Sequence, residues 1–169
     1  MTAFLDEIEA LVPSLRRYAR ALTNNTDLAD DLVQDCLERA IRKRGLWRPQ
    51  MPLRAWLFRI LLNIYRNDLR RQRRRPEGTP FELLAVQPAA QPDQPHRLDL
   101  AETARALAQL PNDQREALLL VALEGLGYAE AATALDIPQG TLMSRLGRAR
   151  AELRRLTGRS QPPRLRTVK

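Results

Sequence analysis

The chain has 169 residues, 44% of them hydrophobic, and a formal net charge of +8, so it can hold one medium domain or two small ones with proper cores. The excess of positive charge indicates a polyanionic partner, with nucleic acid as the first candidate. One cysteine excludes an internal disulfide and a cysteine-based metal site, and the longest apolar run, Ala117 to Leu123, is too short to span a bilayer.

The first residues are acidic, with Asp6, Glu7 and Glu9 near the start, unlike the basic start of a signal peptide. We therefore expect a cytoplasmic, soluble protein with no membrane insertion.

Residues 1–75 show helical periodicity without strand alternation. A first helix is predicted from Thr2 to Leu22, and the polar residues 24–26 offer caps for a second helix. A loop from Arg44 to Pro52 then precedes a third helix from Leu53 to about Arg75. The predicted buried sides of the three helices carry Leu5, Ile8, Leu11, Val12, Leu15, Tyr18, Ala19 and Leu22, then Leu28, Leu32, Val33, Cys36, Leu37, Ala40 and Ile41, then Leu53, Leu57, Ile60, Leu61, Ile64 and Leu69.

The outer face of the second helix is acidic and carries Asp27, Asp30, Asp31, Asp35 and Glu38. The early acids are favourable at a helix N-terminus, but the later ones repel one another at i+3 and i+4 spacing. A basic protein partner would relieve that repulsion. A metal site is the rival interpretation, but one helix cannot surround an ion with carboxylates.

The third helix and the loop before it combine arginines with aromatic residues. Because bases of single-stranded DNA stack on aromatic rings while arginines follow the backbone, this mixture favours opened nucleic acid. Trp56 is predicted to pack in the core, and Trp47 and Phe58 to be freer. Arginine supplies 26 of the 28 basic residues, a preference that codon bias alone would also produce.

Residues Pro76 to His96 hold five prolines, three acids and no lysine or arginine. Proline at this density forbids a long helix, so we interpret the segment as an interdomain linker. Such a linker either lies in a basic channel of a partner or stays solvated.

Residues Leu126 to Leu156 are predicted to form a helix, a three-residue break and a second helix, with Pro138 at the first position of the second helix. The second helix should bury Leu142, Leu146, Ala149 and Leu153 and turn a basic face outward. This pattern is typical of a helix-turn-helix whose second helix lies in the DNA major groove. A solvated helical hairpin is the alternative, but seven acids and two arginines from Leu98 to Gly140 give way to nine bases and one acid from Thr141 onward, and such segregation favours DNA.

These residues carry a resemblance to the extracytoplasmic-function (ECF) sigma factors of bacterial RNA polymerase. ADDLVQDCLERA (Ala29–Ala40) resembles their polymerase-docking segment, and the segment Pro52–Arg75 resembles their segment that reads and opens the −10 element. The segment Leu110–Leu153 is similar to their −35-reading domain. The resemblance implies an all-α fold of two small helical domains joined by a Pro-rich linker, with ranges 1–75, 76–97, 98–157 and a basic tail at 158–169.

The resemblance also implies partners and residue roles. The partners are core polymerase, through its β′ clamp helices and β flap, promoter DNA and an anti-sigma factor; no cofactor, metal or catalytic residue is expected. Polymerase docking would use Asp30, Asp31, Leu32, Gln34 and Asp35. Recognition and melting of the −10 element would use Trp47, Arg48, Gln50, Asn63, Arg66 and Arg70. Contacts to the −35 duplex would come from Thr141, Ser144, Arg145 and Arg148.

The sequence also departs from the family pattern. Met143 and Gly147 stand where many members have basic or bulkier residues, so fewer base contacts are expected at −35. The segments Ala29–Arg42 and Leu53–Asn63 resemble the alphaproteobacterial general-stress subgroup, whose members are held by an anti-sigma protein.

Two other classes of function fit the sequence less well. A stand-alone helix-turn-helix regulator would bind duplex DNA alone, but it would leave the acidic second helix without a role. An enzyme such as a nuclease needs clustered carboxylates or histidines, and the one histidine, His96, is expected in the linker.

Overall fold

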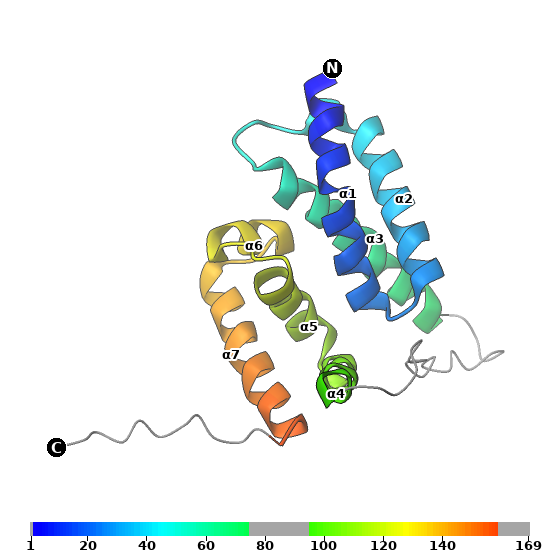
Figure 1. Ribbon diagram of the computed structural model, residues 1–169. Coiled ribbons are helices and arrows are strands. Elements are labelled where there is room, and N and C mark those ends of the chain that lie inside the picture. Colours follow the sequence, from blue (N-terminus) through cyan, green and yellow to red (C-terminus); the bar gives the residue numbers. More distant parts are fainter. Residues whose placement is uncertain (1, 75–94, 159–169) are drawn as a thin grey trace.

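The structure is a computed structural model that describes residues 2–74 and 95–158 (Figure 1). The first group of helices comprises α1 (Thr2–Thr23), α2 (Thr26–Arg42), a 3-10 turn (Arg44–Leu46) and α3 (Leu53–Arg74). The second group comprises α4 (Pro95–Gln109), α5 (Asn112–Leu118), a π-helical turn (Leu119–Leu123), α6 (Tyr128–Leu135) and α7 (Gln139–Leu156). The all-α prediction with two small helical domains is confirmed. Most of the predicted linker and the basic tail lie outside the described residues, and α4 begins at Pro95, so His96 lies in the first turn of this helix.

The predicted cap of the second helix is present at Asn25. Its side-chain Oδ1 accepts a hydrogen bond from the Leu28 N–H at 3.0 Å, which satisfies one of the free donors at the start of α2. Asn24 adopts a left-handed φ of 51°, which asparagine tolerates better than most residues. The chain therefore reverses between α1 and α2 within a few residues.

Replacing this cap gives a simple stability test. Asn25→Ala is expected to lower the free energy of unfolding by about 1 kcal/mol, because the Leu28 N–H loses its acceptor. Asn25→Ser is the matched control, since serine caps helices about as well as asparagine. Urea unfolding monitored by circular dichroism measures both, and equal midpoints for the alanine and serine variants would contradict the capping role.

The core of the first group is centred on two aromatic rings. Phe58 packs edge-on against Tyr18, with ring centroids 5.0 Å apart, and both side chains are buried. Cys36 is buried in the same core, and its thiol donates to the carbonyl oxygen of Leu57 at 3.5 Å. Burial raises the pKa of Cys36 to about 12, so the thiol is an unreactive core group, as its place on the helix predicted.

Three residues of the predicted buried sides are exposed instead. Leu5, Leu28 and Ile41 are 43%, 38% and 41% exposed. Leu5 and Leu28 lie in the first turns of their helices and Ile41 lies in the last turn of α2. Helical periodicity correctly indicates the inward side of these helices along most of their length, and the three exceptions all lie in a terminal turn.

In the second group, a π-helical turn continues α5 and ends at Glu124, whose N–H bonds to the Leu119 carbonyl at 3.1 Å. Gly125 then turns the chain with a φ of 67°, a conformation that glycine adopts without strain. The predicted three-residue break between α6 and α7 is confirmed. Pro138 precedes α7 as its N-cap residue and is not its first helical residue, while Leu142, Leu146 and Ala149 are buried as predicted.

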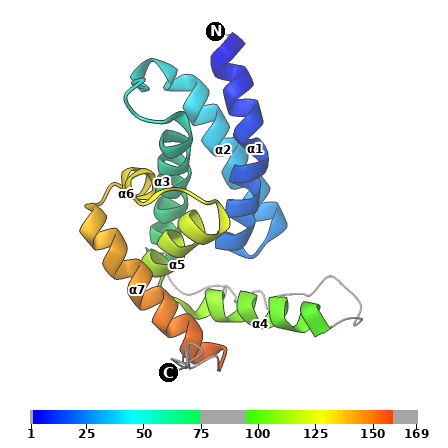
Figure 2. The ribbon, with the colours of Figure 1, turned by 60° about the vertical axis from the view of Figure 1, so that its left-hand side comes forward.

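The two groups of helices pack against each other in this structure. Helix α6 lies against α3, as seen where they cross in Figure 2. Buried residues of both groups form one continuous apolar cluster. The side of α3 that faces α6 is therefore covered by the second group.

Candidate nucleic-acid interface

The acidic face of α2 is exposed and stands beside two arginines of α1. Asp30 lies 3.8 Å from both Arg16 and Arg20, whereas Asp31 and Asp35 have no ion-pair partner among the described residues. Gln34 is also exposed and donates to Glu38 at 3.3 Å. This face therefore presents negative charge that the described part of the fold leaves largely unneutralised.

Leu32, which was predicted as a docking residue beside these acids, lies in the core. Its side chain is only 5% exposed and belongs to the apolar cluster. Its contribution is to hold α2 in place, since a buried leucine cannot form a surface contact.

The loop between α2 and α3 is shaped by Trp47. The indole N–H of Trp47 donates to the Met51 carbonyl at 3.0 Å, and the indole ring packs 5.8 Å from the ring of Phe4. Arg48 and Gln50 are exposed on the loop between these two anchor points. Trp47 thus fixes the loop, and the exposed polar side chains are the ones free to contact a ligand.

The aromatic residues of α3 differ from the sequence-based expectation. Phe58, predicted to be free, is 1% exposed, and Trp56, predicted to be in the core, is only partly buried. Residues two apart point to different sides of a helix, so the two side chains have different neighbours: Phe58 faces Tyr18, while Trp56 lies toward Phe4. Stacking of bases on Phe58 is therefore excluded in this fold.

The residues of α3 that were predicted to contact DNA are of two kinds. Asn63 is exposed and Arg70 lies at the basic end of the helix, whereas Arg66 is half-buried in an ion pair with Glu116 of α5 at 2.6 Å. That end of the helix is strongly basic and largely exposed, with Arg70, Arg71, Arg73 and Arg74. Asn63, Arg66, Arg70 and Arg73 nevertheless line one cavity together with residues of the second group.

Helix α7 turns its predicted contact residues outward. Thr141, Ser144 and Arg148 are exposed. Arg145 is partly covered, and its Nε lies 3.5 Å from the Asp113 carboxylate of α5. The geometry matches a helix-turn-helix in which the second helix offers hydroxyl and guanidinium groups to a duplex.

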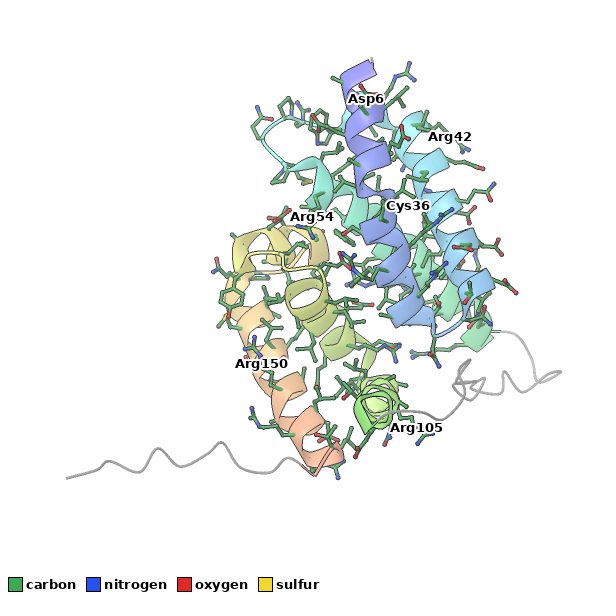
Figure 3. All side chains as sticks on the ribbon, in the orientation of Figure 1. Asp6, Cys36, Arg42, Arg54, Arg105 and Arg150 are labelled. Atoms are coloured by element: carbon green, nitrogen blue, oxygen red, sulfur yellow. The ribbon has the colours of Figure 1, made fainter. Side chains whose placement is uncertain are left out.

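Sequence reasoning missed the contacts between the two groups of helices. Glu116 and Glu124 are buried acids of the second group, and their partners Arg17, Arg54 and Arg66 lie on α1 and α3. Figure 3 labels Arg54 at this boundary and Arg150 on the distant α7. The sequence carried one signal for these contacts. Glu116 directly precedes an apolar run and Glu124 directly follows it, and charged residues next to a buried segment are rarely buried unless they are paired.

Two kinds of site are absent from the part of the chain that the structure describes. No group of three histidine, cysteine, aspartate or glutamate residues there could hold a metal ion. Within the same residues, no helix is long and apolar enough to cross a membrane.

Comparison with known proteins identifies both groups of helices. The model of the Sigma2 domain of PhyR matches residues 8–62, and the model of Sigma-70, region 4 matches residues 100–153. The ECF RNA polymerase sigma factor EcfG of Rhodopseudomonas palustris (strain TIE-1) is 45% identical over 148 residues, which cover 88% of this chain and 81% of that protein. The ECF RNA polymerase sigma-E factor of Escherichia coli (strain K12) is 33% identical over 131 residues, covering 71% of this chain and 69% of that protein.

Solved structures agree with this assignment. The sigma factor RpoE from Bartonella quintana, solved in complex with the anti-sigma factor NepR, is 33% identical with a TM-score of 0.77, covering 95% of this chain and 100% of that chain. CnrH, solved with the cytosolic domain of CnrY, is 30% identical with a TM-score of 0.68, covering 95% of this chain and 90% of that chain. The chain belongs to the extracytoplasmic-function sigma factors of bacterial RNA polymerase, which are initiation factors and not enzymes.

Proposed function

We propose that this sigma factor directs transcription of a general-stress regulon, with domains at residues 1–75 and 98–157. The observation that carries the proposal is the separation of charge: an exposed acidic face on α2 and an exposed basic face on α7. The first suits a basic protein surface and the second suits DNA. The similarity to EcfG supports the stress assignment.

Docking to core polymerase is assigned to Asp30, Asp31, Gln34 and Asp35, with the β′ clamp helices as their partner. Asp31 and Asp35 carry most of the attraction, because Asp30 is already shared with Arg16 and Arg20. The second domain would contact the β flap. Both contacts place the protein on polymerase in the cytoplasm.

Recognition of the −10 element is assigned to the loop Trp47–Pro52 and the adjoining part of α3. Arg48 and Gln50 would contact a base taken out of the stack, while Trp47 holds the loop in shape through its bond to Met51. Asn63, Arg66 and Arg70 would lie along the melted strand. Contacts to the −35 duplex are assigned to Thr141, Ser144, Arg145 and Arg148.

The loop assignment gives a test at Gln50. Gln50→Ala is expected to reduce the yield of open complexes roughly tenfold, since about 1 to 1.5 kcal/mol is lost with a hydrogen bond to the extruded base. Initial binding to duplex promoter should change little. Permanganate reactivity of unpaired thymines measures opening, and gel shift at low temperature measures initial binding.

Gln72→Ala is the matched control, because Gln72 is also exposed but lies at the far end of α3. Normal permanganate reactivity in Gln50→Ala would remove the loop from base recognition.

An anti-sigma factor is the proposed regulator. One similar sigma factor, RpoE from Bartonella quintana, was solved in complex with the anti-sigma factor NepR. An anti-sigma protein of the NepR type is the expected partner here, given the similarity to EcfG, to the Sigma2 domain of PhyR and to the RpoE solved with NepR.

The proposed function is tested by transcription in vitro on a genomic library with purified core polymerase. Start sites that appear only when this protein is added, upstream of stress genes and sharing −35 and −10 sequences, are the expected result. Absence of any new start site would overturn the proposal. Specific binding to promoters without polymerase would favour a stand-alone helix-turn-helix regulator instead.

A further inference from the structure

Two acids of the second domain are buried where that domain meets the first. Glu116 and Glu124 are 2% and 5% exposed. Charged side chains are almost never this buried unless they are paired. Their partners come from the other domain, so their burial depends on how the two domains are placed.

Glu124 is bound by three side chains of the first domain. Arg17 donates from Nε and Nη2 to its two carboxylate oxygens at 2.9 and 2.7 Å, a paired geometry that is strong and directional. Ser14 donates to the same carboxylate, and Arg54 lies 3.7 Å from it while donating to the Glu124 backbone carbonyl. The π-helical turn before Glu124 places this residue at the boundary.

Glu116 makes a second set of contacts about two helical turns away. Arg66 donates to its carboxylate from Nε at 3.1 Å and from Nη2 at 2.6 Å, and the Tyr18 hydroxyl donates to its backbone carbonyl at 3.0 Å. At the edge of the same boundary, Arg59 donates to the Thr133 carbonyl at 2.7 Å and to Asp136 at 2.8 Å. Four arginines of the first domain are therefore held by the second.

This arrangement brings together residues that we assign to two different promoter elements. A cavity of about 420 Å³ is lined by Asn63, Arg66 and Arg70 of the first domain and by Arg145 of the second. The −35 and −10 elements are separated by about 25 base pairs, or roughly 85 Å of duplex at about 3.4 Å per step. The protein therefore cannot contact the −35 and −10 elements at the same time while α6 lies on α3.

We propose that Glu116 and Glu124 form an electrostatic latch that holds this sigma factor in a closed state unable to engage both promoter elements. The inhibitory role of the latch rests on the proposed function, whereas the contacts that form the latch do not. Opening exposes two carboxylates and the arginines that bound them. Arg66 then passes from Glu116 to nucleic acid phosphate, so the acid competes with DNA for the same guanidinium group.

The test uses the full-length chain with Glu116→Gln and Glu124→Gln, which remove charge and keep shape. Arg17→Ala breaks the Glu124 contact from the other side and is not among the residues assigned to DNA or polymerase. Glu152→Gln is the control, because it removes one acid of the second domain whose ion pair, with Arg155 at 2.6 Å, lies within α7. Thermal unfolding establishes that each variant is folded.

Small-angle X-ray scattering is carried out without DNA or polymerase. The double variant, which carries both Glu116→Gln and Glu124→Gln, is expected to have a larger radius of gyration than the wild type. Arg17→Ala should show a smaller increase and Glu152→Gln none. In transcription with saturating core, the concentration of sigma factor at half-maximal transcript should fall roughly tenfold for the double variant. An unchanged radius of gyration in a folded double variant would overturn the latch. A larger radius with no fall in that concentration would overturn its inhibitory role.

Scattering and transcription also separate this proposal from the function itself. A wild-type protein that gives no promoter-specific transcript would contradict the proposed function, whereas the scattering of the variants would still decide whether the latch exists.

Discussion

Reversing both charges at Asp31 and Asp35 to lysine is expected to abolish binding to core polymerase, with affinity falling by at least about a hundredfold. Two favourable charge pairs are replaced by two like-charge pairs, and such pairs cost several kcal/mol at a protein interface. The fold should be unaffected, because both carboxylates are exposed and lack ion-pair partners among the described residues. Two lysines repel each other at i+4 spacing much as the two carboxylates do, so this pair affects the stability of α2 similarly before and after the reversal.

Retention of the variant on immobilised core polymerase measures this effect. The double reversal of Glu7 and Glu9 to lysine is the matched control, since these acids are also exposed but lie on α1. Circular dichroism shows whether helicity is kept. Normal retention of the Asp31 and Asp35 variant would remove the acidic face from the docking site.

Replacing Arg145 and Arg148 with alanine is expected to weaken promoter-specific transcription by about 1 to 3 kcal/mol for each bidentate hydrogen-bonded pair with guanine that the substitution removes. Arg148 is exposed, while Arg145 is oriented by Asp113 at 3.5 Å. The larger effect is therefore expected at Arg145, whose direction is partly fixed before DNA arrives. Competition between the natural promoter and a −35 variant measures the effect.

Arg154→Ala provides the control, because it removes one positive charge from the same helix nearly two turns beyond Arg148. An equal reduction on every DNA sequence would show that Arg145 and Arg148 contact phosphates and not bases. Unchanged transcription in Arg145→Ala and in Arg148→Ala would contradict the assignment of α7 to the −35 element.

Local features of the fold were predictable from the sequence because their causes lie within a few residues. Helix α3 begins at Leu53 as predicted, and the break at residues 136–138 separates two helices as predicted. Asn25 caps α2 because a side-chain acceptor there reaches an N–H three residues later. Such signals need no knowledge of the rest of the chain.

Other features depend on contacts between distant residues and could not be predicted in this way. The exchange of roles between Trp56 and Phe58 depends on where Tyr18 and Phe4 lie. The pairing of Glu124 with Arg17 spans 107 positions of the sequence. The sequence can indicate that an acid lies at a position expected to be buried, which is unusual. Only the folded chain shows which arginine neutralises it.

Reconstitution with sigma-free core polymerase, comparing association and promoter footprints with and without core, decides whether this chain works as a sigma factor. We expect a stable complex with core and a footprint over the −35 and −10 elements that appears only when core is present. A chain that never associates with core, yet protects the same promoter sites alone, would contradict this expectation.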